Sequence, residues 1–362
     1  MTINVLHVDT ERGWRGGERQ VFWLARELAR RGHGTIVAAR GGELLAQRAL
    51  HEGMRVVVCN PRSEVDPVAA LRLRRVIRDE KVDVVHAHTA HAVALAALST
   101  VGTRVPFVVA RRVDFALRSN VGTRLKYRNA ARFIAVSIAV AKVLERGGID
   151  RQRIAVIPDG VDVHRTVLAA SRESLSEFTI PRDASIAVQV AQLVGHKDPV
   201  NFVRAIARAR AAIPELHGLL VGDGPLRGEV EEAIRNLRLE NVVHLAGYRT
   251  DADALLAAAD VAVLSSREEG MGSVLLDALV FGRPIAATNA GGIPEVVSDD
   301  CGLIAPLGDP DALGDAIARI VSDRTLAARM GERGRARAGE FSVERMTDRT
   351  IEVYESVLAG AR

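Results

Sequence analysis

Short apolar runs rich in β-branched residues alternate with helical patterns along the whole chain. In the first half, runs with strand character cover residues 3–8, 35–39, 55–59, 82–86, 107–110, 133–137 and 154–157. Segments with apolar residues at helical spacing, such as residues 67–78 and 90–99, lie between them. Because this alternation is typical of parallel strands joined by covering helices, the chain is expected to be an α/β protein.

The second half repeats the alternation. Its strand-like runs are residues 186–191, 218–221, 242–245, 261–265 and 284–288, and its helical patterns are residues 199–212, 228–237, 251–259, 273–281 and 311–322. A length of 362 residues with 48% hydrophobic content allows two cores. The sequence therefore predicts two doubly wound parallel-sheet domains, residues 1–170 and 171–340. Residues 341–362 form a final helix that is expected to pack back on the first domain.

Composition excludes several classes of protein. No run of about 18 apolar residues is present, so no membrane span is expected. The N-terminus enters a strand directly, without the basic and apolar regions of a signal peptide. Cys59 and Cys301 lie far apart in apolar contexts, which indicates buried thiols rather than a disulfide or a metal site, and a cytoplasmic location.

Charge is distributed unevenly along the chain. The net charge is +4, but basic residues outnumber acidic ones in residues 1–180 and the reverse holds afterwards. One basic cluster comprises Arg118, Arg124, Lys126, Arg128 and Arg132. Two interpretations stay open: a solvated basic surface, or a surface that docks a lipid-linked or phosphorylated acceptor at the inner face of a membrane.

The stretch from residue 266 to residue 295 carries the clearest chemical signal. Glu269 and Asp277 lie eight positions apart, across a Gly-rich turn and the start of an apolar helix. A strand–turn–helix of this kind directs backbone N–H groups at an anion, and Gly270 and Gly272 permit its close approach. The two carboxylates can bind hydroxyl groups on either side of that anion. A nucleotide-sugar has this chemistry.

Several motifs in this order and at these separations are typical of one family. They are Gly16-Gly17-Glu18, residues 157–162 (IPDGVD), 190–197 (VAQLVGHK), 221–225 (VGDGP), 259–266 (ADVAVLSS), the Glu269/Asp277 pair and residues 291–295 (GGIPE). With them the chain resembles glycosyltransferase family 4, the retaining nucleotide-sugar transferases, essentially from end to end. The resemblance implies the GT-B fold, in which two facing Rossmann-like domains enclose a donor cleft.

The resemblance also assigns roles to individual residues. Lys197 matches the lysine that holds the donor diphosphate, and Ser273 and Val274 match the helix start that binds a phosphate. Glu269 matches the carboxylate that holds the transferred sugar, and Asp277 the one that holds the ribose. The remaining donor-binding positions implied are Gly16 and Gly17, in a loop that closes over the diphosphate, together with Gln192, Gly222, Tyr248 and Gly272.

Three positions depart from the family pattern. Asp277 stands where Glu is usual, and Gln192 stands where an Arg often shares the diphosphate. Arg112 occupies the position of a frequent His; an arginine cannot act as a base, but it can bind a phosphate or an acidic acceptor. His88, at the end of a strand, is expected either to contact donor or acceptor or to be a structural histidine.

The chain is thus expected to be a retaining glycosyltransferase of cell-envelope polysaccharide synthesis, cytoplasmic or peripheral at the inner membrane face. A UDP- or GDP-sugar is the expected donor and a glycan or lipid-linked molecule the acceptor, with no cofactor, no metal and no nucleic acid. The histidines at 86, 88 and 91 are weak evidence for a metal site. A nucleotide-sugar isomerase or hydrolase and a catalytically silent binding protein stay open. A nicotinamide oxidoreductase is disfavoured, because the glycines at 13, 16 and 17 do not fit G-x-G-x-x-G.

Overall fold

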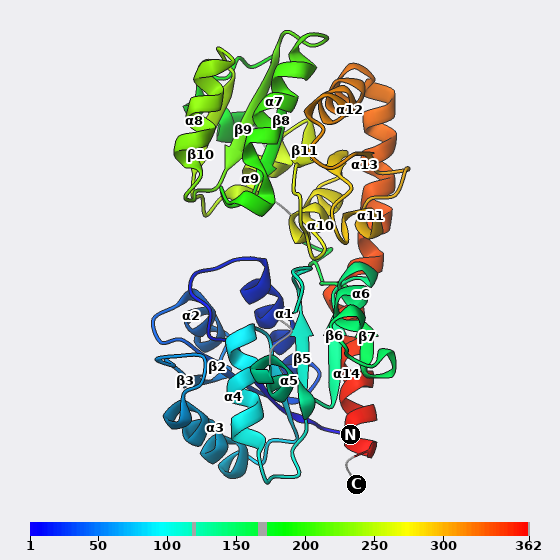
Figure 1. Cartoon of the computed structure of the whole chain (residues 1–362). Helices are drawn as coiled ribbons and strands as arrows, with labels where there is room; N and C mark the ends of the chain where they lie inside the picture. Colours follow the sequence, from blue (N-terminus) through cyan, green and yellow to red (C-terminus); the bar gives the residue numbers. More distant parts are fainter. Residues whose placement is uncertain (118–120, 166–171, 361–362) are drawn as a thin grey trace. The chain divides into compact units, whose positions relative to one another are not determined.

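The computed structural model describes residues 1–117, 121–165 and 172–360, which form two compact α/β units (Figure 1). The first unit consists of Met1–Gly160 and Ser342–Arg362, and the second of Val161–Phe341. Of the basic cluster, Arg118 and the side chain of Arg124 lie outside the described residues. No helix within the described ranges is both long and apolar enough to cross a membrane.

The first unit is built on a seven-stranded parallel sheet with the order β3-β2-β1-β4-β5-β6-β7. Its strands are β1 (Asn4–Val8), β2 (Gly34–Ala39), β3 (Arg55–Val58), β4 (Val84–Ala87), β5 (Phe107–Arg111), β6 (Arg132–Ala135) and β7 (Ile154–Val156). β1 pairs with β2 on one side and with β4 on the other. The order therefore reverses between β1 and β4, where a doubly wound sheet gathers its functional groups.

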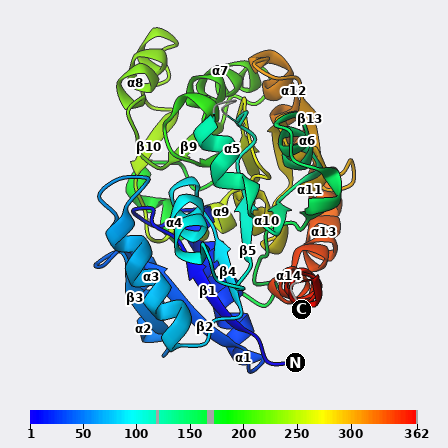
Figure 2. The same ribbon diagram turned by 60° about the horizontal axis from the view of Figure 1, so that its bottom comes forward.

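Helices cover both faces of this sheet. They are α1 (Gly16–Arg30), α2 (Leu44–His51), α3 (Pro67–Asp79), α4 (Ala90–Thr100), α5 (Val121–Arg128), α6 (Ile138–Arg146) and α14 (Val343–Gly360), with the short 3-10 helix η1 (Arg151–Arg153). α1 packs against α2 and α14, whereas α4 packs against α3 and α5. α3 and α4 lie side by side in both views (Figure 1 and Figure 2).

The last helix belongs to the first unit because it completes that unit's core. Tyr354 of α14 is fully buried, and its hydroxyl lies 2.6 Å from Nδ1 of His86 on β4. Leu6, Leu28 and Phe107 are also almost fully buried in this unit. Burying each such side chain contributes about 1.5–3 kcal/mol.

The second unit contains a six-stranded parallel sheet with the order β10-β9-β8-β11-β12-β13. Its strands are β8 (Ser185–Val190), β9 (Leu216–Val221), β10 (Val243–Gly247), β11 (Val261–Leu264), β12 (Ile285–Thr288) and β13 (Gly302–Ala305). The order reverses between β8 and β11. The sequence predicted five of these strands and missed β13 at the edge.

Helices again flank the second sheet. They are η2 (Arg172–Phe178), η3 (Gly195–Lys197), α7 (Pro199–Arg210), α8 (Arg227–Asn236), α9 (Ala252–Ala258), α10 (Ser273–Val280), α11 (Ile293–Val296), α12 (Pro310–Ser322), α13 (Arg324–Ala338) and η4 (Gly339–Phe341). An Asp-Pro pair starts both α7 and α12, with the proline at a position where its missing N–H costs nothing. In α12, Oδ1 of Asp309 accepts from the Ala312 N–H at 2.9 Å and so caps the helix.

Two predicted boundaries differ from the structure. α1 begins at Gly16, so Gly16 and Gly17 start a helix, whereas the resemblance implied that they lie in a loop. α13 forms a regular helix, although the sequence predicted no helix between residue 322 and the final helix at residue 341. The reason is packing: a Cβ on Gly331 of α13 would run into the carbonyl oxygen of Gly282, the residue that follows α10 with φ +62°. Glycine thus lets α13 approach the end of α10.

This close approach predicts that Gly331→Ala destabilises the second unit by about 1–3 kcal/mol, because the new methyl group overpacks a backbone contact. Gly228→Ala is the matched control, since a Cβ at that position of α8 meets none of the described atoms within 4 Å. That variant should be neutral or slightly stabilising, as alanine favours a helix more than glycine does. Urea unfolding followed by far-UV circular dichroism measures both; equal midpoints for the two variants would contradict the packing argument.

Candidate functional site

In the second unit, Lys197 and Glu269 form an ion pair beyond the carboxyl ends of β8 and β11. Lys197 ends η3, which follows β8, and Glu269 lies in the loop between β11 and α10. Their side chains are 21% and 12% exposed, respectively. The hydroxyl of Ser266 lies 3.3 Å from Oε2 of Glu269 and donates to it. The two charges predicted to hold the donor therefore meet in one place and neutralise each other.

A buried network holds the two loops together. The Ser265 N–H donates to Oε1 of Gln189 on β8 at 3.0 Å, and the Ser265 hydroxyl lies 2.8 Å from the backbone oxygen of Asp198. Arg267 Nε donates to Oδ2 of Asp198 at 2.5 Å. Because Asp198 also caps α7, the positions of Lys197 and Glu269 are fixed relative to a rigid helix.

The start of α10 has the features of an anion site. Gly272 precedes the helix with φ +79°, a conformation that glycine adopts without strain. It has no side chain, so it cannot cap the first N–H groups of the helix, which carry a partial positive charge. Ser273 and Val274 are the first two helical residues and are half-buried. These features are those of a helix start that can bind a phosphate. The assignment of Ser273 and Val274 to the donor phosphate stays a prediction.

Asp277 lies one turn further along α10 and is 2% exposed. The Nη2 group of Arg165 donates to its Oδ1 at 2.6 Å, and Nη1 of the same arginine lies 3.0 Å from Asp253. The guanidinium also stacks over Phe281, 5.0 Å from the ring centroid. Sequence reasoning missed Arg165, although it lies only three positions after the end of the IPDGVD motif.

The other predicted donor residues lie in different settings. Gly222, with φ +140°, leaves no room for a Cβ against the Ala191 carbonyl. Packing alone therefore requires glycine at this position. Gln192 is exposed, and Tyr248 is 63% exposed. Gly16 and Gly17 belong to the first unit, as do His88 and Arg112. Within the second unit, the structure gathers the lysine, the two carboxylates and the helix start at the carboxyl edge of the sheet.

Arg112, just after β5 in the first unit, is held by two partners. Its Nε donates to Oδ1 of Asp159 at 3.0 Å, and its Nη1 lies 3.3 Å from Nδ1 of His88. The Arg112 side chain is 14% exposed and that of Asp159 is 8% exposed. The charge expected to bind a phosphate or an acidic acceptor is therefore already paired with a carboxylate.

Asp9 follows β1 at the same edge, and sequence reasoning did not single it out. Burial, and after it the neighbouring Glu18 carboxylate, raises the pKa of Asp9 from its usual 3.8 to about 7. Burial also raises the pKa of Glu18, whose Oε2 accepts from the Arg15 N–H at 2.7 Å. An acidic residue directly after an apolar strand was the signal for Asp9 that the sequence offered.

Three histidines meet on the first sheet near this edge. Ligand atoms of His7, His86 and His88 all lie within 4.8 Å of one another. The sequence had grouped His91 with His86 and His88, but His91 is half exposed and lies 3.7 Å from Glu11. His7 takes its place because β1 pairs with β4 in a register that sets His7 beside His86. The expectation of no metal site stays a prediction.

Comparison with known families identifies the chain. Residues 14–165 match the family described as Glycosyltransferase Family 4, and residues 171–337 match Glycosyl transferases group 1. The chain therefore belongs to the glycosyltransferases that these two descriptions cover, and it is a transferase.

The similar curated proteins include enzymes of envelope and small-molecule glycosylation. The lipopolysaccharide core biosynthesis glycosyltransferase LpsE of Rhizobium meliloti (strain 1021) is 30% identical over 289 residues, covering 79% of this chain and 79% of LpsE. The N-acetyl-alpha-D-glucosaminyl L-malate synthase of Bacillus anthracis is 27% identical, covering 81% of this chain and 80% of the synthase.

Solved structures confirm the fold. The Anabaena protein HepE, crystallised in complex with UDP-glucose, superimposes with a TM-score of 0.86 at 22% identity, covering 98% of this chain and all of HepE (100%). The two parallel-sheet units and this likeness confirm the prediction of a GT-B fold.

The buried Asp9 carboxyl predicts a pH dependence of stability. Because its folded-state pKa of about 7 lies above the usual 3.8, the folded chain holds a proton that the unfolded chain has lost between these pH values. Stability should therefore fall as pH rises through this window, by roughly 3–4 kcal/mol from this group. Asp9→Asn removes the titration, so the variant should gain stability relative to wild type as pH rises.

Urea unfolding from pH 4.5 to pH 8 measures the difference, with the fluorescence of Trp14 and Trp23 reporting on the first unit. Asp150→Asn, an exposed position in the same unit, is the control and should follow wild type. Parallel stability curves for Asp9→Asn and wild type would show that Asp9 titrates normally.

Proposed function

We propose that the protein transfers a sugar, with retention of anomeric configuration and without a metal ion, from a UDP- or GDP-sugar to a hydroxyl group of a glycan or lipid-linked acceptor. The observation that carries the proposal is the grouping in the second unit. Lys197 pairs with Glu269 beyond β8 and β11, and the Gly272-led start of α10 precedes the buried Asp277. These groups match a ligand made of a diphosphate flanked by two polyhydroxyl rings.

Each group has a defined task in this proposal. Lys197 and the N–H groups at the start of α10 stabilise the charge that develops on the leaving diphosphate. Glu269 accepts hydrogen bonds from the transferred sugar, and Asp277 accepts them from the ribose. Arg165 engages one oxygen of Asp277, and a carboxylate offers about four lone-pair directions, so this bond does not exhaust its acceptor capacity.

The proposed chemical step needs no separate base. The acceptor oxygen bonds to the anomeric carbon on the face that the diphosphate leaves, while the bond between that carbon and the phosphate oxygen breaks. The proton of the acceptor hydroxyl moves to the departing phosphate oxygen, so atoms and charges balance. An arginine at position 112 is compatible with this step, because the step requires no histidine there.

Two names among the relatives support this assignment. LpsE is named as a glycosyltransferase of lipopolysaccharide core biosynthesis, and HepE was crystallised with UDP-glucose. We extend both to this chain as a proposal: an envelope glycan acceptor and a uridine nucleotide donor. The names of LpsE and of the Bacillus anthracis synthase favour a transferase over the isomerase or hydrolase alternative, since neither name describes an isomerase or a hydrolase.

The donor site predicts that one nucleoside diphosphate binds without added metal. Lys197→Ala should weaken that binding by about tenfold to a hundredfold, because it removes a charge-assisted hydrogen bond worth about 1.5–3 kcal/mol. Calorimetry with UDP, GDP and ADP measures this, beside Lys142→Ala as the control at an exposed lysine of α6. Excess EDTA should change neither binding nor sugar transfer.

Failure takes distinct forms in this experiment. Binding that is lost with EDTA would show that the metal-independent part is wrong. No binding of any of the three nucleotides to the folded protein would favour a silent relative whose donor site has been disabled at Gln192.

The basic first unit also carries exposed apolar side chains on α3 and α5, which we propose dock on anionic lipid. Val68 of α3 is 74% exposed and Leu125 of α5 is 66% exposed. The salt bridge between Lys126 and Glu64, at 2.5 Å, ties α5 to the loop before α3. Apolar side chains among arginines are the composition of a surface that lies on a membrane without crossing it.

Accordingly, Val68→Glu should reduce cosedimentation with phosphatidylglycerol-containing vesicles several-fold, because a carboxylate would face the lipid surface. Leu307→Glu, at an apolar position of the second unit that is 53% exposed, should leave it unchanged. Equal cosedimentation with purely zwitterionic vesicles would contradict the electrostatic part of the proposal.

A further inference from the structure

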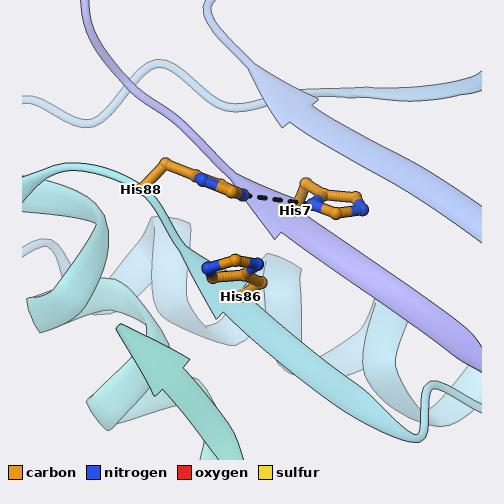
Figure 3. Close-up of side chains that lie close together, drawn as sticks. All are labelled: His7, His86 and His88. Atoms are coloured by element: carbon orange, nitrogen blue, oxygen red, sulfur yellow. Dashed lines mark hydrogen bonds between the residues drawn. The ribbon is translucent and has the colours of Figure 1, made fainter. Parts of the chain in front are cut away.

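The histidine cluster of the first unit is almost completely buried. His7 of β1, His86 of β4 and His88 just after β4 are 0%, 1% and 6% exposed. Figure 3 shows the His88 ring directed at His7, with the His86 ring beside them. The ring centroids of His86 and His88 are 4.0 Å apart. The direction of the hydrogen bonds in this cluster depends on which ring nitrogens carry hydrogen.

Arg112 fixes the proton of His88. A guanidinium group can only donate hydrogen bonds, and Nη1 of Arg112 lies 3.3 Å from Nδ1 of His88. Nδ1 must therefore be an unprotonated acceptor. In a neutral imidazole the other nitrogen then carries the hydrogen, so His88 is protonated at Nε2.

The assignment passes on to His7. Nε2 of His88 lies 3.1 Å from Nδ1 of His7, so the His88 N–H donates and His7 accepts. His7 must in turn carry its own hydrogen on Nε2, which has no hydrogen-bond partner among the described residues. The chain of donors thus runs in one direction, from Arg112 through His88 to His7.

The effect of burial on the pKa values of the three histidines is consistent with neutral imidazole rings. Burial lowers the pKa of His7 to about 3, and it lowers the pKa values of His86 and His88 well below 6.5. The positive charge of Arg112 contributes to each of these three shifts, after burial. A protonated His88 would lose its acceptor nitrogen and would place a second positive charge against Arg112.

The same logic disfavours a metal ion in the cluster. A metal bound at Nε2 of a neutral His88 would leave its hydrogen on Nδ1, where it would oppose the N–H group of Arg112. The donor chain from Arg112 to His7 accounts for both ring nitrogens of His88 without a metal ion.

We propose that His88 and His7 are positioning residues for Arg112, and that with Asp159 they hold its guanidinium in one orientation as a hydrogen-bond donor to sugar hydroxyls. Asp159 balances the arginine charge at 3.0 Å, and the histidines add none. Asp9 and Glu18 bring further carboxyl groups to this edge, and neither adds a positive charge that would attract an anion. The role of Arg112 in catalysis rests on the proposed transferase function, whereas its orientation does not.

The orientation is tested by tautomer-sensitive NMR of the full-length protein labelled with 15N-histidine. Spectra that connect ring nitrogens to ring C–H protons distinguish a protonated nitrogen from an unprotonated one; His7 and His88 are assigned through His7→Asn and His88→Asn. Both should carry the hydrogen on Nε2 at neutral pH. Arg112→Met should release Nδ1 of His88, so that a population protonated at Nδ1 appears. Arg112→Lys, which keeps a donor, should preserve the wild-type pattern.

Two results would overturn the proposal. One is a wild-type His88 that is charged or protonated at Nδ1. The other is a Zn²⁺ titration that shifts the signals of all three histidines together, which would make the cluster a metal site. Because these readouts require no activity, they stand even if no sugar transfer is found.

The catalytic consequence is tested with His88→Asn and His88→Gln. The Asn side chain places an oxygen near the Nδ1 position, where it can accept from Arg112, whereas the longer Gln places its amide nearer Nε2. If His88 only filled space, His88→Gln should be the more active variant, because the volume of Gln is closer to that of His. Positioning instead predicts that kcat for nucleotide-sugar turnover is about tenfold or more higher in His88→Asn than in His88→Gln, with the donor KM little changed. A higher kcat in His88→Gln would show that His88 only fills space.

Discussion

In both units the strands are all parallel, and helices cover the two faces of the sheet. A fully covered sheet has no solvated face, so side chains that bind or react gather beyond the carboxyl ends of the strands. Lys197 and Glu269 lie there in the second unit, and Asp9 and Arg112 lie there in the first. The chemistry of this protein depends on that single constraint of the fold.

Charges at these two edges are paired within each unit. Lys197 is paired with Glu269, Arg165 with Asp277, and Arg112 with Asp159. A half-buried charge that lacked a partner would be costly, so pairing within each unit reduces the cost of burying these charges. A ligand that binds these charges must therefore replace existing ion pairs. Only the free-energy difference between the ligand's contacts and the ion pairs that they replace contributes to affinity. For this reason the number of charges near the site does not by itself predict affinity.

Much of the fold was predictable from the sequence, because buried parallel strands and amphipathic helices leave strong periodic signals. The exceptions have physical causes. β13 is a short edge strand whose residues Leu303 and Ile304 are not fully buried, so its apolar signal is weak. α13 contains Gly331 and Gly334, which lower helix propensity but permit contact with α10 and its flanking residues. Propensity argued against a helix there, and tertiary packing outweighed it.

The candidate site divides in the same way. Lys197, Glu269 and Asp277 were found because each lies in a motif that is local in sequence. Arg165 and His7 were missed because their contacts are non-local. Arg165 reaches Asp277 across 112 positions, and His7 reaches His88 across 81. The contact of His7 follows from the strand order, which sets β1 beside β4. A sequence reading that had assigned this order would have placed His7 with His86 and His88.

The distribution of protons at these edges bears on the proposed mechanism. A general base must be unprotonated, within reach of the acceptor and not already engaged as a hydrogen-bond acceptor. His88 fails this requirement, because Arg112 occupies its one acceptor nitrogen. Arg112 and Lys197 are cationic side chains that only donate hydrogen bonds. None of these three groups is a candidate base, so the proposed transfer of the proton to the departing phosphate oxygen is compatible with them. An arginine in place of the family's frequent histidine is therefore compatible with the proposed sugar transfer.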